Sequence, residues 1–298
     1  MWFWLSLVAI LFWSGSDLFS KIGSKPDDLY SHWKMVMAVG SVMGIHAFIE
    51  LLQGASLCFS DLLTYLPVSV LYISAMILGY VGLRYVVLSV STPICNSSGA
   101  VAALLCFLFL NQKMSGFQLL AIALVSIGIF SLSVLEKKQD DLKRSREGIV
   151  TDRKYTHSLI ALLFPIFYCM IDGLGTFADA FVLNKLIDEE SANIAYELTF
   201  LLLAVLAFFY VVFIKNQKIN LFDEKPKILA GLFETAGQFA YIYALGGNAI
   251  VAAPLISSYC VFSVLWARFI LKEKLVWKQY AAIAIAVVGI VILGAEGS

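Results

Sequence analysis

Apolar residues occur along the chain in long, nearly unbroken runs with short polar intervals between them. A helix that crosses a membrane needs about 20 mostly apolar residues. Ten segments meet this requirement, at residues 2–21, 33–53, 65–86, 92–111, 116–135, 157–182, 193–214, 227–246, 249–271 and 277–294. The pattern predicts an all-α integral membrane protein with ten transmembrane helices.

The longest polar interval separates the fifth of these segments from the sixth. It contains seven basic residues and shows no apolar periodicity, so we interpret it as a solvated linker rather than as a domain. The chain then divides into a first five-helix half at residues 1–135, a polar basic linker at residues 136–156 and a second five-helix half at residues 157–298.

The two halves contain two copies of one pattern. Residues 73–132 and 234–293 align without a gap, and fifteen of the sixty aligned positions are identical. Several identities involve residue types that apolar composition alone does not explain, namely Tyr80 and Tyr241, Pro93 and Pro254, Lys113 and Lys274, Gln118 and Gln279, and Gly128 and Gly289. We infer an internal duplication.

The odd number of helices in each half determines how the copies are oriented. A second half that follows five crossings starts on the opposite side of the bilayer, so the two halves are predicted to be inverted repeats. Such repeats are related by a pseudo-two-fold axis in the membrane plane, and alternating-access carriers place their substrate site near the midplane between them. The duplication is therefore the strongest argument for transport that the sequence offers.

Basic residues are distributed unevenly between the two sides of the predicted bundle. The odd-numbered loops and the linker hold nineteen of the 21 Lys and Arg residues, and only Lys113 and Lys185 lie in even-numbered loops. Cytoplasmic loops accumulate basic residues. We expect a multi-pass protein of the cell membrane, whether inner or plasma membrane, with a cytoplasmic linker and both termini outside.

The composition agrees with a membrane location and excludes other classes of protein. Hydrophobic residues make up 60% of the chain and charged residues only 14%, against about a quarter charged in soluble domains. Basic and acidic residues are equal at 21 each, so no net charge indicates a nucleic-acid partner. The five cysteines and three histidines show no metal-ligand spacing, and no HExxH motif or Ser/His pair at helical spacing is present. We expect no cofactor, no metal and no enzymatic activity.

Three motifs in the second half follow one another in a fixed order: APLISSY at residues 253–259, LKEKL at 271–275 and VGIVIL at 288–293. The first half repeats this pattern at residues 93–98, 110–113 and 127–129. In these residues the sequence resembles the EamA family of the drug/metabolite transporter superfamily, over essentially the whole chain. One departure is Gln112, which stands where the family usually has the acidic residue kept at Glu273.

The resemblance implies a ten-helix secondary carrier for small metabolites. It also implies a central cavity lined by the first, third, fourth, sixth, eighth and ninth helices. Members of the family carry amino acids, amines, nucleotide-linked compounds and drugs, so the resemblance alone does not select a substrate.

Ionisable residues inside the predicted helices are the first candidates for a functional site. A charged side chain at the centre of a membrane helix costs about 2.5–3.5 kcal/mol or more. Asp172 lies about the middle of segment 157–182, and we expect it to balance a cationic substrate or to couple transport to protons. Its counterpart Asp17 lies near the cytoplasmic end of the first helix, where it contacts substrate or pairs with Lys21 one turn away.

Polar residues on three other helices extend this candidate site. Glu234, Gln238 and Tyr241 share one face of the eighth helix, because they are spaced by one and two turns. Lys34 and Glu197 occupy aligned positions in the two halves, and we predict a salt bridge between them. His46 lies one turn from Glu50, and for it we expect a hydrogen bond between helices.

A polar cluster follows a proline in each copy, at residues 96–98 and 257–259. Proline leaves a backbone carbonyl in the preceding turn without its usual donor, so these side chains satisfy either the backbone or a ligand. Aromatic residues lie near the polar positions and suit a protonated amine through cation–π attraction. The candidate substrate-binding residues are Trp13, Asp17, Tyr80, Asn96, Ser97, Tyr168, Asp172, Glu234, Gln238, Tyr241, Ser258 and Tyr259.

The sequence as a whole predicts a secondary active transporter for a small polar metabolite, such as an amino acid, an amine or a similar cation or zwitterion. Alternating access driven by protons or by another gradient is the expected mechanism. The alternatives are a flippase for lipids or lipid-linked compounds and a non-transporting accessory subunit, and a membrane enzyme is the least favoured. The expected partners are the substrate and membrane lipids. A monomer is sufficient, since one chain holds both halves, and a homodimer is compatible with the sequence.

Overall fold

The computed structural model describes residues 1–23, 28–85, 95, 97–110, 114–146, 159–270 and 275–297. These residues form a bundle of helices and contain no strand. The first half contributes α1 (Trp2–Gly23), α2 (Ser31–Leu52), α3 (Phe59–Tyr85), α5 (Ser98–Phe109) and α6 (Gly116–Arg146). The second half contributes α8 (Leu159–Lys185), α9 (Glu189–Phe208), the π-helix η1 (Phe209–Ile214), α10 (Lys225–Ile256), α11 (Tyr259–Ile270) and α12 (Trp277–Gly297).

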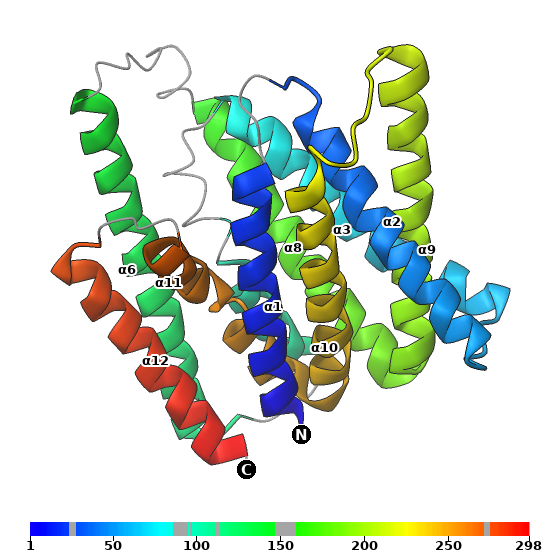
Figure 1. Cartoon of the computed structure of the whole chain (residues 1–298). Helices are drawn as coiled ribbons and strands as arrows, with labels where there is room; N and C mark the ends of the chain where they lie inside the picture. The colour runs from blue at the N-terminus through cyan, green and yellow to red at the C-terminus, as the bar shows by residue number, and fades with distance from the viewer. Residues whose placement is uncertain are drawn as a thin grey trace.

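Long apolar helices make this chain a multi-pass membrane protein. Seven segments of the described residues are long and apolar enough to cross a bilayer, namely Trp2–Ser20, Ser31–Leu52, Gly116–Leu135, Pro165–Lys185, Glu189–Ile214, Lys225–Ile256 and Trp277–Glu296. Three shorter apolar helices accompany them, at Phe59–Ala75, Ser98–Phe109 and Tyr259–Ile270. Both termini lie at the same end of the bundle (Figure 1), at the bottom of the view.

Two helices differ from the predicted segments. α6 continues past residue 135 to Arg146, so the first part of the predicted linker is helical. This part is rich in Lys, Glu and Arg, which have high intrinsic helix propensity. The predicted boundary between the eighth and ninth helices is confirmed at Asn248, where φ is −163° and ψ is 82°, so α10 consists of two helical segments that meet at a kink. A second interruption, which was not predicted, divides the ninth segment at the turn of Ser257 and Ser258.

The turn at Ser257 and Ser258 has a local cause. Pro254 has no backbone N–H, which weakens the last turn of α10. The chain compensates with short-range bonds: the Ser257 hydroxyl donates to the Ala253 carbonyl at 3.0 Å, and the Ser258 amide donates to the Leu255 carbonyl at 3.0 Å. α11 then begins in the next residue.

The helices of the two halves pack in corresponding pairs. The contact of α1 with α10 corresponds to the contact of α8 with α3. In the same way, the contact of α1 with α11 corresponds to the contact of α8 with α5. α2 packs on α9, and α6 packs on α12. α10 contacts α2 as α3 contacts α9. Each of these pairings therefore has its equivalent when the first and second halves are exchanged.

Two glycines bring α6 and α12 into backbone contact. A Cβ atom on Gly128 would lie 2.7 Å from the Ala286 Cβ, and a Cβ atom on Gly289 would lie 2.7 Å from the carbonyl oxygen of Ala121 and 2.8 Å from a methyl group of Val125. Ala286 and Val125 are themselves equivalent positions of the aligned repeats. Small residues at such crossings let membrane helices pack closely without a hydrophobic driving force between them.

α9 starts at a side-chain cap outside the apolar span. Asp188 has an extended backbone, and its carboxylate accepts a hydrogen bond from the Ser191 backbone amide at 2.8 Å. This bond lowers the pKa of Asp188 below its ordinary value. The cap satisfies one of the amides that every helix start leaves without a partner.

We expect Gly128→Ala to destabilise the protein by about 1–3 kcal/mol, because the added methyl group overpacks the α6–α12 crossing. Gly289→Ala is expected to have an effect of similar size. The control is Gly116→Ala, since a Cβ atom there would meet nothing within 4 Å. Thermal unfolding of the purified protein in detergent measures the three variants, and equal melting temperatures for Gly128→Ala and Gly116→Ala would show that the crossing tolerates a side chain.

Candidate functional site

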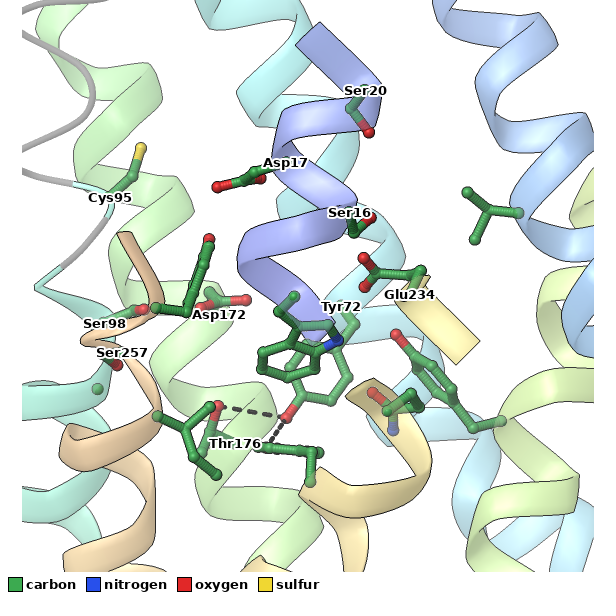
Figure 2. Close-up of a pocket in the computed structure, with 18 of the residues that line it drawn as sticks. Ser16, Asp17, Ser20, Tyr72, Cys95, Ser98, Asp172, Thr176, Glu234 and Ser257 are labelled. Atoms are coloured by element: carbon green, nitrogen blue, oxygen red, sulfur yellow. Dashed lines mark hydrogen bonds between the residues drawn. The ribbon is translucent and has the colours of Figure 1, made fainter. Parts of the chain in front are cut away.

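A cavity of about 420 Å³ lies between helices of both halves. Its lining comes from α1, α2, α3, α5, α8, α9, α10 and the start of α11. Eight of the predicted site residues line this cavity: Trp13, Asp17, Tyr168, Asp172, Glu234, Gln238, Tyr241 and Tyr259. The structure thus gathers candidates from α1, α8, α10 and α11 around one space (Figure 2).

The other four predicted residues do not join this lining. Ser97 borders a separate cavity of about 30 Å³ together with Pro254 and Ser257. Ser258 is fully buried, and its hydroxyl has no hydrogen-bond partner among the described residues. Asn96 and the side chain of Tyr80 lie outside the described residues.

Three carboxylates from three helices surround the cavity. Asp172 on α8 lies beside the Ser98 side chain, and Glu234 on α10 lies beside the Ser16 side chain (Figure 2). Asp17 on α1 accepts a hydrogen bond from the Ser263 hydroxyl at 2.8 Å. A carboxylate has about four acceptor positions, so each retains capacity for a ligand. No Lys or Arg is among the described residues of the lining, which is consequently acidic.

Aromatic rings form one wall of the cavity. The Trp13 ring lies 4.9 Å from the Tyr241 ring and 5.9 Å, edge to face, from the Tyr259 ring, measured between centroids. Gly237 makes this wall possible, because a Cβ atom there would lie 2.4 Å from the Trp13 indole. The flat face of an indole or phenol attracts organic cations.

Two buried hydrogen-bond donors at the cavity have no partner in the described part of the chain. They are the indole Nε1 of Trp13 and the side-chain Nε2 of Gln238, whose residue is only 3% exposed. A buried donor without an acceptor costs about 1–3 kcal/mol. Both atoms are therefore available to an acceptor on a ligand, such as a carboxylate.

A buried network that the sequence did not reveal closes one end of the cavity. Asp179 is fully buried and accepts hydrogen bonds from Tyr65 at 2.8 Å and from Tyr72 at 3.5 Å. The Tyr72 hydroxyl also lies 2.6 Å from the Tyr241 hydroxyl and 3.2 Å from the Thr176 hydroxyl, and its single proton serves one of these neighbours at a time. Tyr72, Tyr241 and Thr176 line the cavity, so the network begins at its wall.

The opposite end of the cavity is open. Asp17 is exposed, and it lies with Ser20 at the end of the cavity opposite Thr176 (Figure 2). The cavity therefore opens toward the end of α1, away from the two termini, and stops at the tyrosine network.

The predicted salt bridge between Lys34 and Glu197 is wrong. The Lys34 ammonium lies 2.6 Å from Asp28, whereas Glu197 bonds to the His46 ring nitrogen at 2.9 Å. α2 and α9 run in opposite directions, so the start of α2 faces the end of α9, as the contact of Trp33 with the Tyr210 ring at 5.3 Å shows. The hydrogen bond between helices predicted for His46 is confirmed.

Lys34 belongs instead to a group of charges at the end of the bundle. Burial raises the pKa of the Asp28 carboxyl, but the hydrogen bond from Lys34 and the charges of Lys34 and Lys227 lower it below its ordinary value overall. Lys34 also lies 3.6 Å from Glu224, which pairs with Lys227. These charges stay near the polar ends of α2 and α10.

Comparisons with known proteins agree with this architecture. The model of the EamA-like transporter family matches residues 176–295, which confirms the family resemblance for the three motifs of the second half. No curated protein matches the chain. A solved structure described as "Crystal structure of protein" is 14% identical, covers 99% of this chain and 96% of its own, and has a TM-score of 0.73. At that identity the likeness shows the fold alone.

We expect Tyr65→Phe to destabilise the protein by about 1–3 kcal/mol, because the buried Asp179 carboxylate loses its shortest hydrogen bond. Tyr280→Phe, at an exposed tyrosine of α12, serves as the control. Thermal unfolding of Tyr65→Phe, Asp179→Asn and the double variant gives their coupling energy. Strictly additive effects would mean that this hydrogen bond does not support the fold.

Proposed function

Because residues 176–295 carry the sequence of an EamA-like transporter, we propose that the chain is a secondary active transporter for a small zwitterion or organic cation, such as an amino acid or an amine. The observation that carries the proposal is the cavity itself. It combines three carboxylates with an aromatic wall, and no basic residue lies in the described part of its lining.

The acidic lining favours a positively charged group on the substrate. Asp172 and Glu234 are half-buried on facing helices, and Asp17 stands at the open end. An ammonium group entering between them exchanges its water for carboxylate oxygens and for the faces of Trp13 and Tyr259. Cation–π attraction contributes about 0.5–2 kcal/mol for each ring. An anionic substrate without an amine would be repelled by the same carboxylates.

The unpartnered donors favour a carboxylate at the other end of the substrate. Trp13 Nε1 and Gln238 Nε2 are buried and lack acceptors among the described residues. A ligand carboxylate that bonded to them would remove the cost of leaving both donors unsatisfied. The volume of about 420 Å³ falls in the range of about 300–1,000 Å³ for small-molecule sites. These features together favour an amino acid over a simple amine.

The arrangement of the helices supports ten crossings as two inverted repeats. Exchanging the halves maps the α1–α10, α1–α11 and α2–α10 contacts onto α3–α8, α5–α8 and α3–α9, and the α2–α9 and α6–α12 contacts onto themselves. At the α6–α12 crossing, Gly128 meets Ala286 and Gly289 meets Val125, which are reciprocal positions of the repeats. Both termini lie at one end of the bundle, as an even number of crossings requires. Inverted repeats around a central site are the basis of alternating access.

The proposed cycle uses the two ends of the cavity in turn. Cytoplasmic loops accumulate basic residues, and their distribution in this chain predicts that the open end beside Asp17 faces the cytoplasm. The tyrosine network then faces outside. Separation of Tyr72 from Tyr241, together with closure around Asp17, would turn the site to the other side. Asp172 is the proposed coupling residue, because protonating it removes one of the charges that hold a cation. The gradient of protons, or of a second substrate, would then drive transport.

We expect Asp172→Asn to abolish transport coupled to proton movement, with a loss of at least about 100-fold in rate, which corresponds to ~2.7 kcal/mol. The assay uses proteoliposomes with a pH-sensitive dye in the lumen, and candidate amines and amino acids are added outside. Asp61→Asn, near the start of α3 and away from the cavity, is the control. Unchanged transport by Asp172→Asn would remove the proposed coupling site, and scrambling of a labelled lipid without solute uptake would favour the flippase alternative.

We expect Gln238→Met to discriminate between a zwitterion and a cation. The variant replaces the amide, and with it the Nε2 donor, by an apolar side chain of similar length. Affinity for an amino acid is expected to fall about tenfold, equivalent to about 1.4 kcal/mol, while affinity for the amine left by its decarboxylation stays unchanged. Ligand-induced shifts in melting temperature measure both. Equal losses for the two ligands would show that Gln238 does not bind the carboxylate.

A further inference from the structure

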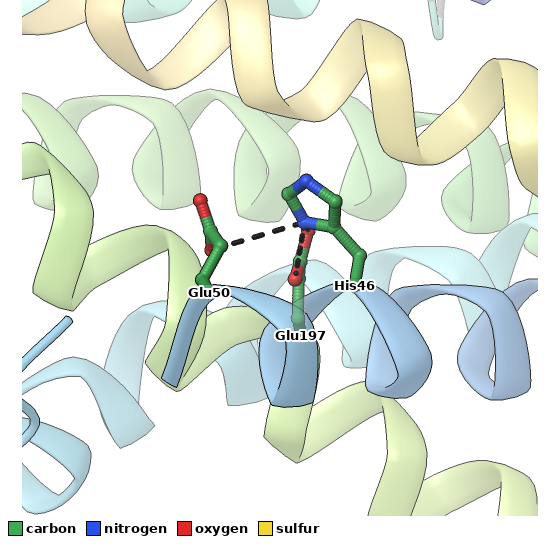
Figure 3. Close-up of side chains that lie close together, drawn as sticks. All are labelled: His46, Glu50 and Glu197. Carbon is green, nitrogen blue, oxygen red and sulfur yellow. Dashed lines mark hydrogen bonds and ion pairs between the residues drawn. The ribbon is translucent and has the colours of Figure 1, made fainter. Parts of the chain in front are cut away.

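A second cluster of ionisable side chains lies outside the cavity, where α2 packs on α9 (Figure 3). The His46 ring nitrogen Nδ1 lies 2.9 Å and 3.0 Å from the two carboxylate oxygens of Glu197. It lies 3.8 Å from the nearer oxygen of Glu50. The three side chains offer ligand atoms that all fall within 4.8 Å of one another. We propose that His46, Glu50 and Glu197 form a binding site for a divalent metal ion.

The charges of the cluster do not balance without a cation. Two carboxylates face one imidazole, so a net negative charge remains even when His46 is protonated. Within the described residues, neither Glu50 nor Glu197 forms an ion pair with Lys or Arg. Glu197 is fully buried, and an uncompensated charge there is costly. A divalent ion bound by two carboxylates and a neutral imidazole would make the cluster electrically neutral.

A buried asparagine borders the cluster and, after rotation of its amide, offers it a fourth ligand. Asn193 is fully buried and donates from Nδ2 to Glu50 at 3.3 Å and to Glu197 at 3.2 Å. Its carbonyl oxygen Oδ1 is buried without a hydrogen-bond partner in the described part of the chain. Rotating the amide by half a turn exchanges the two atoms and turns this oxygen toward the carboxylates. Asn193 would then complete a set of four ligands.

The ligand set selects a class of metal. One imidazole nitrogen with carboxylate and amide oxygens suits first-row divalent ions, whereas Mg²⁺ and Ca²⁺ prefer six or more oxygens. For tetrahedral Zn²⁺ with bonds of about 2.0–2.2 Å, neighbouring ligand atoms are about 3.4 Å apart. The distances from His46 to the two glutamates, 2.9 Å and 3.8 Å, bracket this value. Only small side-chain movements are needed to admit the ion.

The position of the cluster allows a metal to enter and to act on the fold. The His46 side chain is 33% exposed, and Glu50 lies in the last turn of α2. Because α2 and α9 belong to different halves, an ion held between them would join the halves and stabilise the observed arrangement. This stabilisation does not depend on the proposed transport activity.

The test uses the full-length protein in detergent, freed of metal with a chelator. We expect equilibrium dialysis against Zn²⁺ to leave about one bound ion per chain and the melting temperature to rise with Zn²⁺ concentration. His46→Gln and Glu50→Gln are each expected to weaken Zn²⁺ binding more than tenfold. Both residues are partly exposed, so the fold tolerates these variants better than a change at the buried Glu197.

His32→Gln, which removes a histidine at the other end of α2, is the matched control and is expected to bind Zn²⁺ like the unaltered protein. The proposal is overturned if the unaltered protein retains no Zn²⁺ or shows no change in melting temperature. It is equally overturned if His32→Gln weakens binding as much as His46→Gln, or if Mg²⁺ stabilises the protein as strongly as Zn²⁺ does.

Discussion

The bilayer supplies no hydrogen-bond partners, so every buried charge in this protein must be satisfied by another part of the chain or by a ligand. This constraint explains where the polar side chains lie. Asp172 and Glu234 face a cavity beside the serines Ser98 and Ser16, while Asp179 accepts hydrogen bonds from tyrosine hydroxyls. The apolar faces of the same helices are left to the lipid and to helix contacts. Polar chemistry is therefore concentrated along the axis of the bundle.

Much of this arrangement is predictable because it depends on local patterns. The length of an apolar run identifies a membrane helix, and the spacing of Glu234, Gln238 and Tyr241 shows that they share a face. Asp172 and Asp179 have the spacing of two turns as well, so Asp179 was detectable by the same reasoning. Its tyrosine partners were not, since Tyr65 and Tyr72 lie on α3, more than a hundred residues away in sequence.

The wrong prediction for Lys34 and Glu197 has a general reason. Aligning two repeats identifies equivalent positions, and equivalent positions do not have to touch. Where α2 crosses α9 in the opposite direction, each residue meets a partner set by the crossing geometry. The interruption at Ser257 was equally hidden, because a proline inside an apolar run weakens a helix but does not determine whether the helix bends or stops.

The segment from residue 249 to residue 256 illustrates what such interruptions permit. It is a short buried rod with a distorted joint before it at Asn248 and a turn after it at Ser257. The backbone is non-helical at Asn248, and at the other joint the Ser258 amide bonds to Leu255 three residues back, so tilting the rod would not require a regular helix to unfold. Ala253 and Ile256 line the cavity, so a tilt of the rod would move part of the cavity wall. A small rotation would reshape the space around a bound solute while the long helices on either side stay in place.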